Sequence, residues 1–120
     1  MSEPVGIVDS VVINVVDLAR QKEFWGAVLG AGVANEIPPL FVWFEPQRPG
    51  GVSVALQAVE HATDGPRRLH LDLGVTDREA AKARVLELGG SHLADREVGG
   101  FGWSVMADPE GNEFCVAVHG

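Results

Sequence analysis

A histidine and an aspartate lie two residues apart in the segment RLHLDLGVTD, residues 68–77. The segment alternates apolar and polar residues, which predicts a half-buried strand with His70 and Asp72 on one face. One interpretation of this pair is a catalytic acid–base couple or an anchor for a ligand. The other is a structural pair whose polar groups satisfy each other or water. The sequence supports the two interpretations about equally.

A second reactive side chain, Cys115, lies in the segment NEFCVAV, residues 112–118. The same alternation predicts Glu113 and Cys115 on one face of a strand and Phe114 on the other. A thiolate beside a histidine is a possible nucleophile or metal ligand. For a cysteine in so apolar a segment, however, a small buried hydrophobe is the favoured interpretation.

The two halves of the chain repeat one plan of elements. Residues 10–18 and 70–78 each predict a strand that ends at an aspartate suited to cap a helix, and each helix-length segment then stops at a glycine. These capping and stopping residues are Asp17 and Gly30 in the first half, and Asp77 and Gly89 in the second. Three strand-like segments follow in each half: 32–36, 39–45 and 51–59, then 91–98, 102–107 and 112–118.

We therefore predict an α+β protein made of two βαβββ modules, which together form one domain over residues 5–119. The modules span residues 5–60 and 66–119, and the polar segment 60–67 links them. One helix covers only one face of a small sheet, so each module keeps a bare face. Two such modules can place their bare faces toward each other or around a common hollow.

Strand phase separates the residues that face the helices from those that face the hollow. The helix-facing set includes Val11, Leu56, Leu71 and Phe114, and the helices are predicted to attach through Phe24, Trp25, Val28 and Leu29, and through Ala81, Val85 and Leu88. The predicted ligand-binding residues are Ser10, Asn14, Trp43, Gln57, His70, Trp103, Glu113 and Cys115. His70 and Asp72 are the catalytic candidates. Trp43 and Trp103 either fill the core or form a stacking wall for a planar molecule.

Three motifs carry a resemblance to a known superfamily: FWGAVLGAGV at 24–33, HLDLGVTD at 70–77 and DPEGNEFCV at 108–116. Together with the two βαβββ modules, they resemble the vicinal oxygen chelate superfamily of glyoxalases, bleomycin-resistance proteins and extradiol dioxygenases. The resemblance covers about residues 5–119 and implies the glyoxalase/bleomycin resistance/dioxygenase fold, in which the two modules form an open, cupped mixed sheet around a hollow. DPEGNEFCV is especially similar to the glyoxalase-like subgroup.

The resemblance also implies where catalytic members hold a divalent metal, namely on the first and last strands of each module. The matching positions here are Ser10, Gln57, His70 and Cys115, and the internal repeat gives nearly the same four by pairing Ser10 with His70 and Gln57 with Cys115. Of these four, only His70 is a ligand of the expected type.

The donor types at these positions argue against a catalytic metal. A serine hydroxyl and an amide oxygen are weak ligands for the metals concerned, and a thiolate with one histidine falls short of the three protein ligands that zinc requires. Asp72 and Glu113 also lie on the inner faces and are possible supplements. We predict no catalytic metal and no other cofactor.

Composition excludes several classes of partner. A net charge of −8 excludes nucleic acid, whose phosphates require a basic surface. No charge-free stretch approaches the roughly 18 residues of a membrane helix, and the first residues do not resemble a secretory signal. A hydrophobic content of 46% and a single cysteine predict a soluble globular protein in the cytoplasm.

We predict that the chain binds a small organic molecule in the hollow, as a binding or resistance-type module without a catalytic metal. The alternative is a lyase, isomerase or dioxygenase that uses His70 with or without a divalent metal. The sequence leaves open whether the protein is an enzyme. Bare sheet faces, together with the dimers common among the proteins it resembles, predict a two-fold homodimer.

Overall fold

The computed structural model of the chain describes residues 3–61 and 69–118. It divides into two compact units, Ser10–His70, and Met1–Asp9 together with Leu71–Gly120. Most of the expected linker, residues 62–67, falls outside the described residues. Neither described helix combines the length and the apolar character that crossing a bilayer requires.

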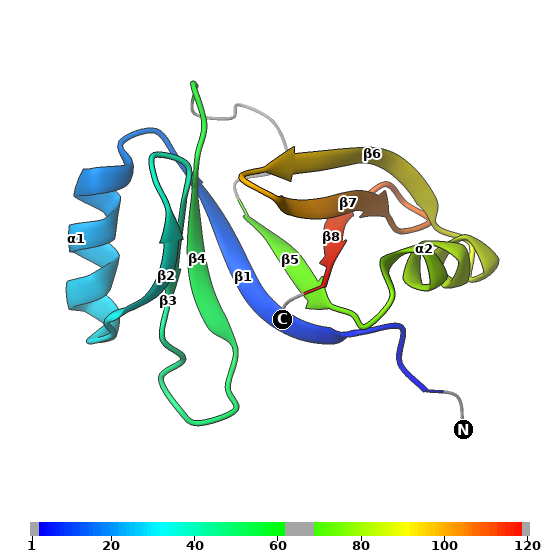
Figure 1. Cartoon of the computed structure of the whole chain (residues 1–120), viewed down its shortest axis with the longest axis horizontal. Helices are drawn as coiled ribbons and strands as arrows, with labels where there is room; N and C mark the ends of the chain where they lie inside the picture. Colours follow the sequence, from blue (N-terminus) through cyan, green and yellow to red (C-terminus); the bar gives the residue numbers. More distant parts are fainter. Residues whose placement is uncertain (1–2, 62–68, 119–120) are drawn as a thin grey trace. The chain divides into compact units, whose positions relative to one another are not determined.

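The elements follow the predicted order of strand, helix and three strands, and this order occurs twice along the chain (Figure 1). The first module consists of β1 (Ile7–Val15), α1 (Leu18–Leu29), β2 (Val33–Ile37), β3 (Phe41–Phe44) and β4 (Ser53–Ala58). The second module consists of β5 (Leu69–Gly74), α2 (Arg78–Glu87), β6 (Ser91–Val98), β7 (Phe101–Ala107) and β8 (Glu113–Ala117).

Each module is a mixed sheet with the same internal arrangement. Neighbouring strands follow the order β2-β3-β4-β1 in the first module and β5-β8-β7-β6 in the second. The first and last strands of each module, β1 with β4 and β5 with β8, run parallel, and the other neighbours are antiparallel. The α+β class and the βαβββ plan are confirmed.

Both helices begin and end as the sequence predicts. An oxygen of Asp17 accepts a hydrogen bond from the backbone N–H of Arg20 at 3.1 Å, and Asp77 accepts one from Ala80 at 3.0 Å. These bonds satisfy backbone donors in the first turn that have no partner within the helix. Gly30 and Gly89 follow the helices with φ of 63° and 100°, in the left-handed region that favours glycine.

Helix α1 packs on β3 and β4 through a narrower stripe than predicted. Leu18, Trp25 and Leu29 contact the core of the first module, which consists of Val15, Val42, Phe44 and Leu56. The prediction for Phe24 and Val28 is wrong, because their side chains are 54% and 59% exposed. Each precedes a packed residue by one position, which turns it about 100° away onto the flank of the helix.

Helix α2 packs more deeply, through the buried side chains of Ala81 and Val85. They join Val75, Met106 and Val116 in the core of the second module, and Leu73 and Phe114 pack against it. Leu88, expected in this core, is exposed because it lies at the C-terminal cap of the helix.

The predicted strand phase is confirmed at Leu56 and Phe114, which contact the cores on the helix side. Leu71 is the register partner of Phe114 but is exposed, so the prediction that the helix covers it is wrong. Helix α2 contacts β6, β7 and β8, and its core reaches β5 only from Leu73 onward. The face of each sheet that is turned away from its helix is called the inner face below.

Candidate functional site

The parallel pair β5 and β8 positions the chemically active residues of the second module. Asp72 is the register partner of Cys115, while Leu71 and Leu73 face Phe114 and Val116. Because side chains alternate along a strand, Asp72 and Cys115 share the inner face and Phe114 lies on the other. His70, two residues before Asp72, falls on the same inner face.

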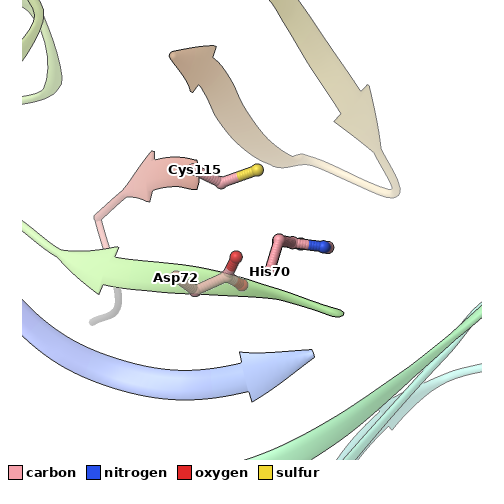
Figure 2. Close-up of side chains that lie close together, drawn as sticks. All are labelled: His70, Asp72 and Cys115. Carbon is pink, nitrogen blue, oxygen red and sulfur yellow. The ribbon is translucent and has the colours of Figure 1, made fainter. Parts of the chain in front are cut away.

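Three donor side chains converge there, as Figure 2 shows. One nitrogen of His70, one carboxylate oxygen of Asp72 and the sulfur of Cys115 all lie within 4.8 Å of one another. His70 and Asp72 are half-buried, and Cys115 is 7% exposed. Such a cluster combines an imidazole, a carboxylate and a thiol, the groups that orient a polar ligand, transfer a proton or coordinate a metal ion.

An aromatic pair lies beside this cluster on β7. Trp103 is the register partner of Ala117, and Val105 is the partner of Cys115, so Trp103 is a diagonal neighbour of the cysteine on the same face, roughly 7–8 Å away. The rings of Trp103 and Phe101 stack with centroids 5.6 Å apart at an angle of 29°. The inner face of the second module therefore carries a polar group of side chains next to a flat aromatic surface. Glu113, at the start of β8, shares this face as the partner of Ala107.

The inner face of the first module carries amides and a second aromatic pair. Gln57 lies between its register partners Asn14 on β1 and Phe41 on β3. Phe41 and Trp43 stack with centroids 5.3 Å apart at 25°, and Trp43 is the partner of Ala55. This face offers amide and aromatic groups, with no titratable side chain at these positions.

Ser10 and Gln57 are not neighbours within the first module. The partner of Ser10 is Ser53, and Ser10 is separated from the row of Asn14 and Gln57 by four residues, or roughly 13 Å of strand. The Oγ of Ser10 is buried and has no hydrogen-bond partner within residues 3–61 and 69–118. The structure therefore gives Ser10 and Gln57 separate surroundings.

The register also corrects the repeat equivalence of Gln57 and Cys115. If the caps Asp17 and Asp77 align the modules, Ser10 corresponds to His70 and Val12 to Asp72. The partner of Val12 is Ala55, whereas the partner of Asp72 is Cys115. Ala55, and not Gln57, is therefore the counterpart of Cys115. The sequence did not reveal this because the loops before the last strands differ in composition.

A second polar cluster, which the sequence did not predict, lies on β6, β7 and α2. One oxygen of Asp95 accepts a hydrogen bond from Ser104 Oγ at 2.6 Å and lies 2.9 Å from His92 Nε2, and Lys82 Nζ is 3.3 Å away. These bonds, that of Ser104 first, hold the pKa of Asp95 well below its usual range. A register shift between His92 and Ala94 brings His92 and Asp95 together, although strand alternation alone would separate them.

The chain was compared with protein families, with curated proteins and with solved structures. The model of a family described as glyoxalase-like domain matches residues 10–117. No curated protein matches the chain in sequence. Among solved structures, methylmalonyl-CoA epimerase from Mycobacterium tuberculosis is 16% identical, with 100% of this chain and 93% of that chain covered and a TM-score of 0.76.

Two further solved structures show the same fold under different names. A glyoxalase/bleomycin resistance protein/dioxygenase superfamily member from Vibrio splendidus 12B01 is 22% identical, covering 92% of this chain and 97% of its own, with a TM-score of 0.61. A protein named NAD-dependent benzaldehyde dehydrogenase from Legionella pneumophila is 17% identical, covering 92% and 98%, with a TM-score of 0.71. At these identities the likeness shows the fold, and the site must indicate the chemistry.

Proposed function

Because the chain belongs to the glyoxalase-like domain family, we propose that it binds a small organic molecule on the inner face of its second module. The observation that carries this proposal is the stacked pair Phe101 and Trp103 beside the cluster of His70, Asp72 and Cys115. A flat apolar surface next to a few convergent polar groups is the usual composition of a small-molecule site. The preferred ligand is therefore a planar or apolar molecule with one polar end.

His70 and Asp72 are proposed to hold the polar end of this ligand, with Glu113 and Cys115 beside them. Ser10, Asn14, Trp43 and Gln57 are proposed as ligand contacts on the first module's own inner face. Stacking and hydrogen bonding are sufficient for such binding, so a binding or resistance-type role needs no catalytic metal. A cytoplasmic location remains a prediction.

Titration of tryptophan fluorescence with a panel of planar aromatic acids, amides and ketones tests the proposal. His70→Ala should weaken binding of a panel hit by roughly ten- to a hundred-fold, the effect of removing one hydrogen-bonding group from a dry site. His92→Ala is the matched control, because His92 bonds Asp95 in the other polar cluster and should leave affinity unchanged. Equal affinities in the wild type and His70→Ala, with a lowered melting temperature only in His70→Ala, would make His70 and Asp72 structural.

A second candidate function is catalysis of the lyase, isomerase or dioxygenase type, with His70 as the acid–base group. The closeness of His70 to Asp72 favours this alternative, because an imidazole beside a carboxylate is suited to proton transfer. The thiol of Cys115 lies in the same cluster. Turnover of a panel hit that His70→Ala abolishes, with binding of the hit retained, would establish catalysis. Unchanged hit after prolonged incubation would support the binding role.

We also propose a two-fold homodimer. Ile7, Leu71 and Val118 are large apolar residues that are exposed in the chain by itself. A stable dimer interface buries at least about 1,000 Å², and exposed apolar side chains are what such an interface covers. Light scattering at tens of micromolar should give twice the chain mass, and the mass of a single chain would contradict the dimer.

A further inference from the structure

We propose that His70, Asp72 and Cys115 form a zinc site whose three protein ligands all come from the parallel strands β5 and β8. The inference departs from the arrangement that the family resemblance implies, in which the two modules share the ligands. It also departs from the expectation of no metal, which counted one histidine and one cysteine. Convergence of Asp72 on that pair supplies the third ligand. The inference does not depend on the binding of an organic molecule.

The geometry of the three side chains is close to what zinc requires. Zinc binds sulfur at about 2.3 Å and nitrogen or oxygen at about 2.0–2.2 Å, so tetrahedral ligands lie roughly 3.3–3.6 Å apart. The three donor atoms already lie within 4.8 Å of one another without a metal. Rotation of side chains closes a gap of this size, and the strands that hold them need not move. The register pairing of Asp72 with Cys115 fixes two of the three ligands opposite each other.

The chemistry of the set selects the class of metal. A thiolate is a soft ligand and disfavours magnesium and calcium, whereas an imidazole, a carboxylate and a thiolate together suit zinc. Cys115 is buried, and a buried thiolate is costly unless a cation neutralises it. Three protein ligands leave one position for water or a ligand oxygen, which is the arrangement of an open zinc site.

The residues that match the family's ligand positions in the first module do not fit the same role. Ser10 and Gln57 offer a hydroxyl and an amide, which are weak ligands, and the register keeps them roughly 13 Å apart along the strands. At the places that correspond to Asp72 and Cys115, the first module has Val12 and Ala55, which carry no ligand atom. The donor set therefore belongs to the second module.

The test uses the full chain without a His tag, freed of metal by a chelator and then titrated with zinc sulfate or cobalt chloride. We expect one equivalent of zinc per chain by elemental analysis after gel filtration. The cobalt form should show tetrahedral visible bands and a near-ultraviolet charge-transfer band from the thiolate. Cys115→Ser should lose the charge-transfer band, and His70→Ala and Asp72→Asn should each weaken zinc binding by at least about tenfold.

Gln57→Ala distinguishes this site from the family arrangement. We expect it to bind zinc as the wild type does, because Gln57 is not among the three ligands. Loss of zinc in Gln57→Ala together with full binding in Asp72→Asn would overturn the proposal in favour of ligands shared between modules. Substoichiometric zinc, or a cobalt form without a thiolate band, would also overturn it.

A measurement on the wild type keeps the test decisive if a variant fails to fold. Zinc should slow the reaction of Cys115 with a thiol reagent, since a metal-bound thiolate is shielded, and magnesium should not. Equal rates with and without zinc would contradict the site. Binding of the panel hit in chelated protein is measured separately, so a failed zinc site and a failed organic site give different results.

Discussion

The two modules share one backbone arrangement but carry different side chains on the inner face of the sheet. At corresponding places on the inner face, the first module has Ser10, Val12 and Ala55 and the second has His70, Asp72 and Cys115. The first three are 0%, 3% and 1% exposed, whereas His70 and Asp72 are half-buried. A βαβββ module requires apolar residues only on its helix side, so at these three places the inner face is free to carry small, buried side chains in one copy and reactive ones in the other.

Placing an aspartate in the first module at the position that corresponds to Asp72 should have the largest effect on stability. Val12→Asp places a charge at a buried site with no prepared partner, which should lower the free energy of unfolding by at least about 3 kcal/mol. Val12→Ala is the control that removes volume without adding charge. Chemical denaturation measures both, and equal losses would show that the site tolerates a carboxylate as the second module does.

The two helices also differ in how deeply their side chains are buried, and truncating one valine on each helix should reveal this difference. Val85→Ala on α2 removes buried side-chain volume and should cost roughly 1.5–3 kcal/mol of stability. Val28→Ala on α1 removes an exposed side chain and should change stability by less than about 0.5 kcal/mol. Urea melts of the two variants give the comparison. A large loss in Val28→Ala would indicate that a second chain covers this flank of α1.

The aromatic pairs provide a smaller contrast in ligand affinity. Trp103→Leu should weaken binding of the panel hit by about 0.5–1.5 kcal/mol, or roughly two- to twelve-fold, because it removes stacking while keeping apolar bulk. Trp43→Leu should have a smaller effect, since its module lacks the His70 cluster. Isothermal calorimetry measures both affinities. The reverse order would move the proposed site to the first module.

The smallest effect should be a change in acid stability from Asp95. Its pKa is lowered in the folded protein, so it contributes stability that is present above the unfolded value near 3.8 and is lost as pH falls below it. Asp95→Asn should therefore flatten the decline of melting temperature between about pH 4 and pH 2 relative to the wild type. Parallel slopes for the two proteins would show that the cluster does not favour the ionised carboxylate.

Much of the fold was predictable because local forces set it. The caps at Asp17 and Asp77 and the glycines after the helices depend on residues within one turn. The turn at residues 108–112 is also local, since Asp108 Oδ1 accepts hydrogen bonds from the backbone N–H groups of Glu110 and Asn112, and Gly111 has φ of 89°. Such elements form from neighbouring residues whatever the rest of the chain does.

The site was predictable only in part because its residues meet through strand pairing. Alternation put His70 and Asp72 on one face and Glu113 and Cys115 on another strand, which sequence can show. It could not show that Asp72 faces Cys115, or that a register shift joins His92 to Asp95. The register between two strands that are distant in sequence is decided by how their side chains pack and how their backbones form hydrogen bonds.

The sequence by itself determined the repeated βαβββ plan, the capped helices and the alternating faces, since these follow from short-range patterns. Tertiary structure decided which helix residues are covered, as the exposure of Phe24 and Val28 shows. It also decided that Ala55, and not Gln57, corresponds to Cys115, and that three donors converge on the inner face of the second module. The physical reason is that burial and register are properties of pairs of distant segments, which no single stretch of sequence contains.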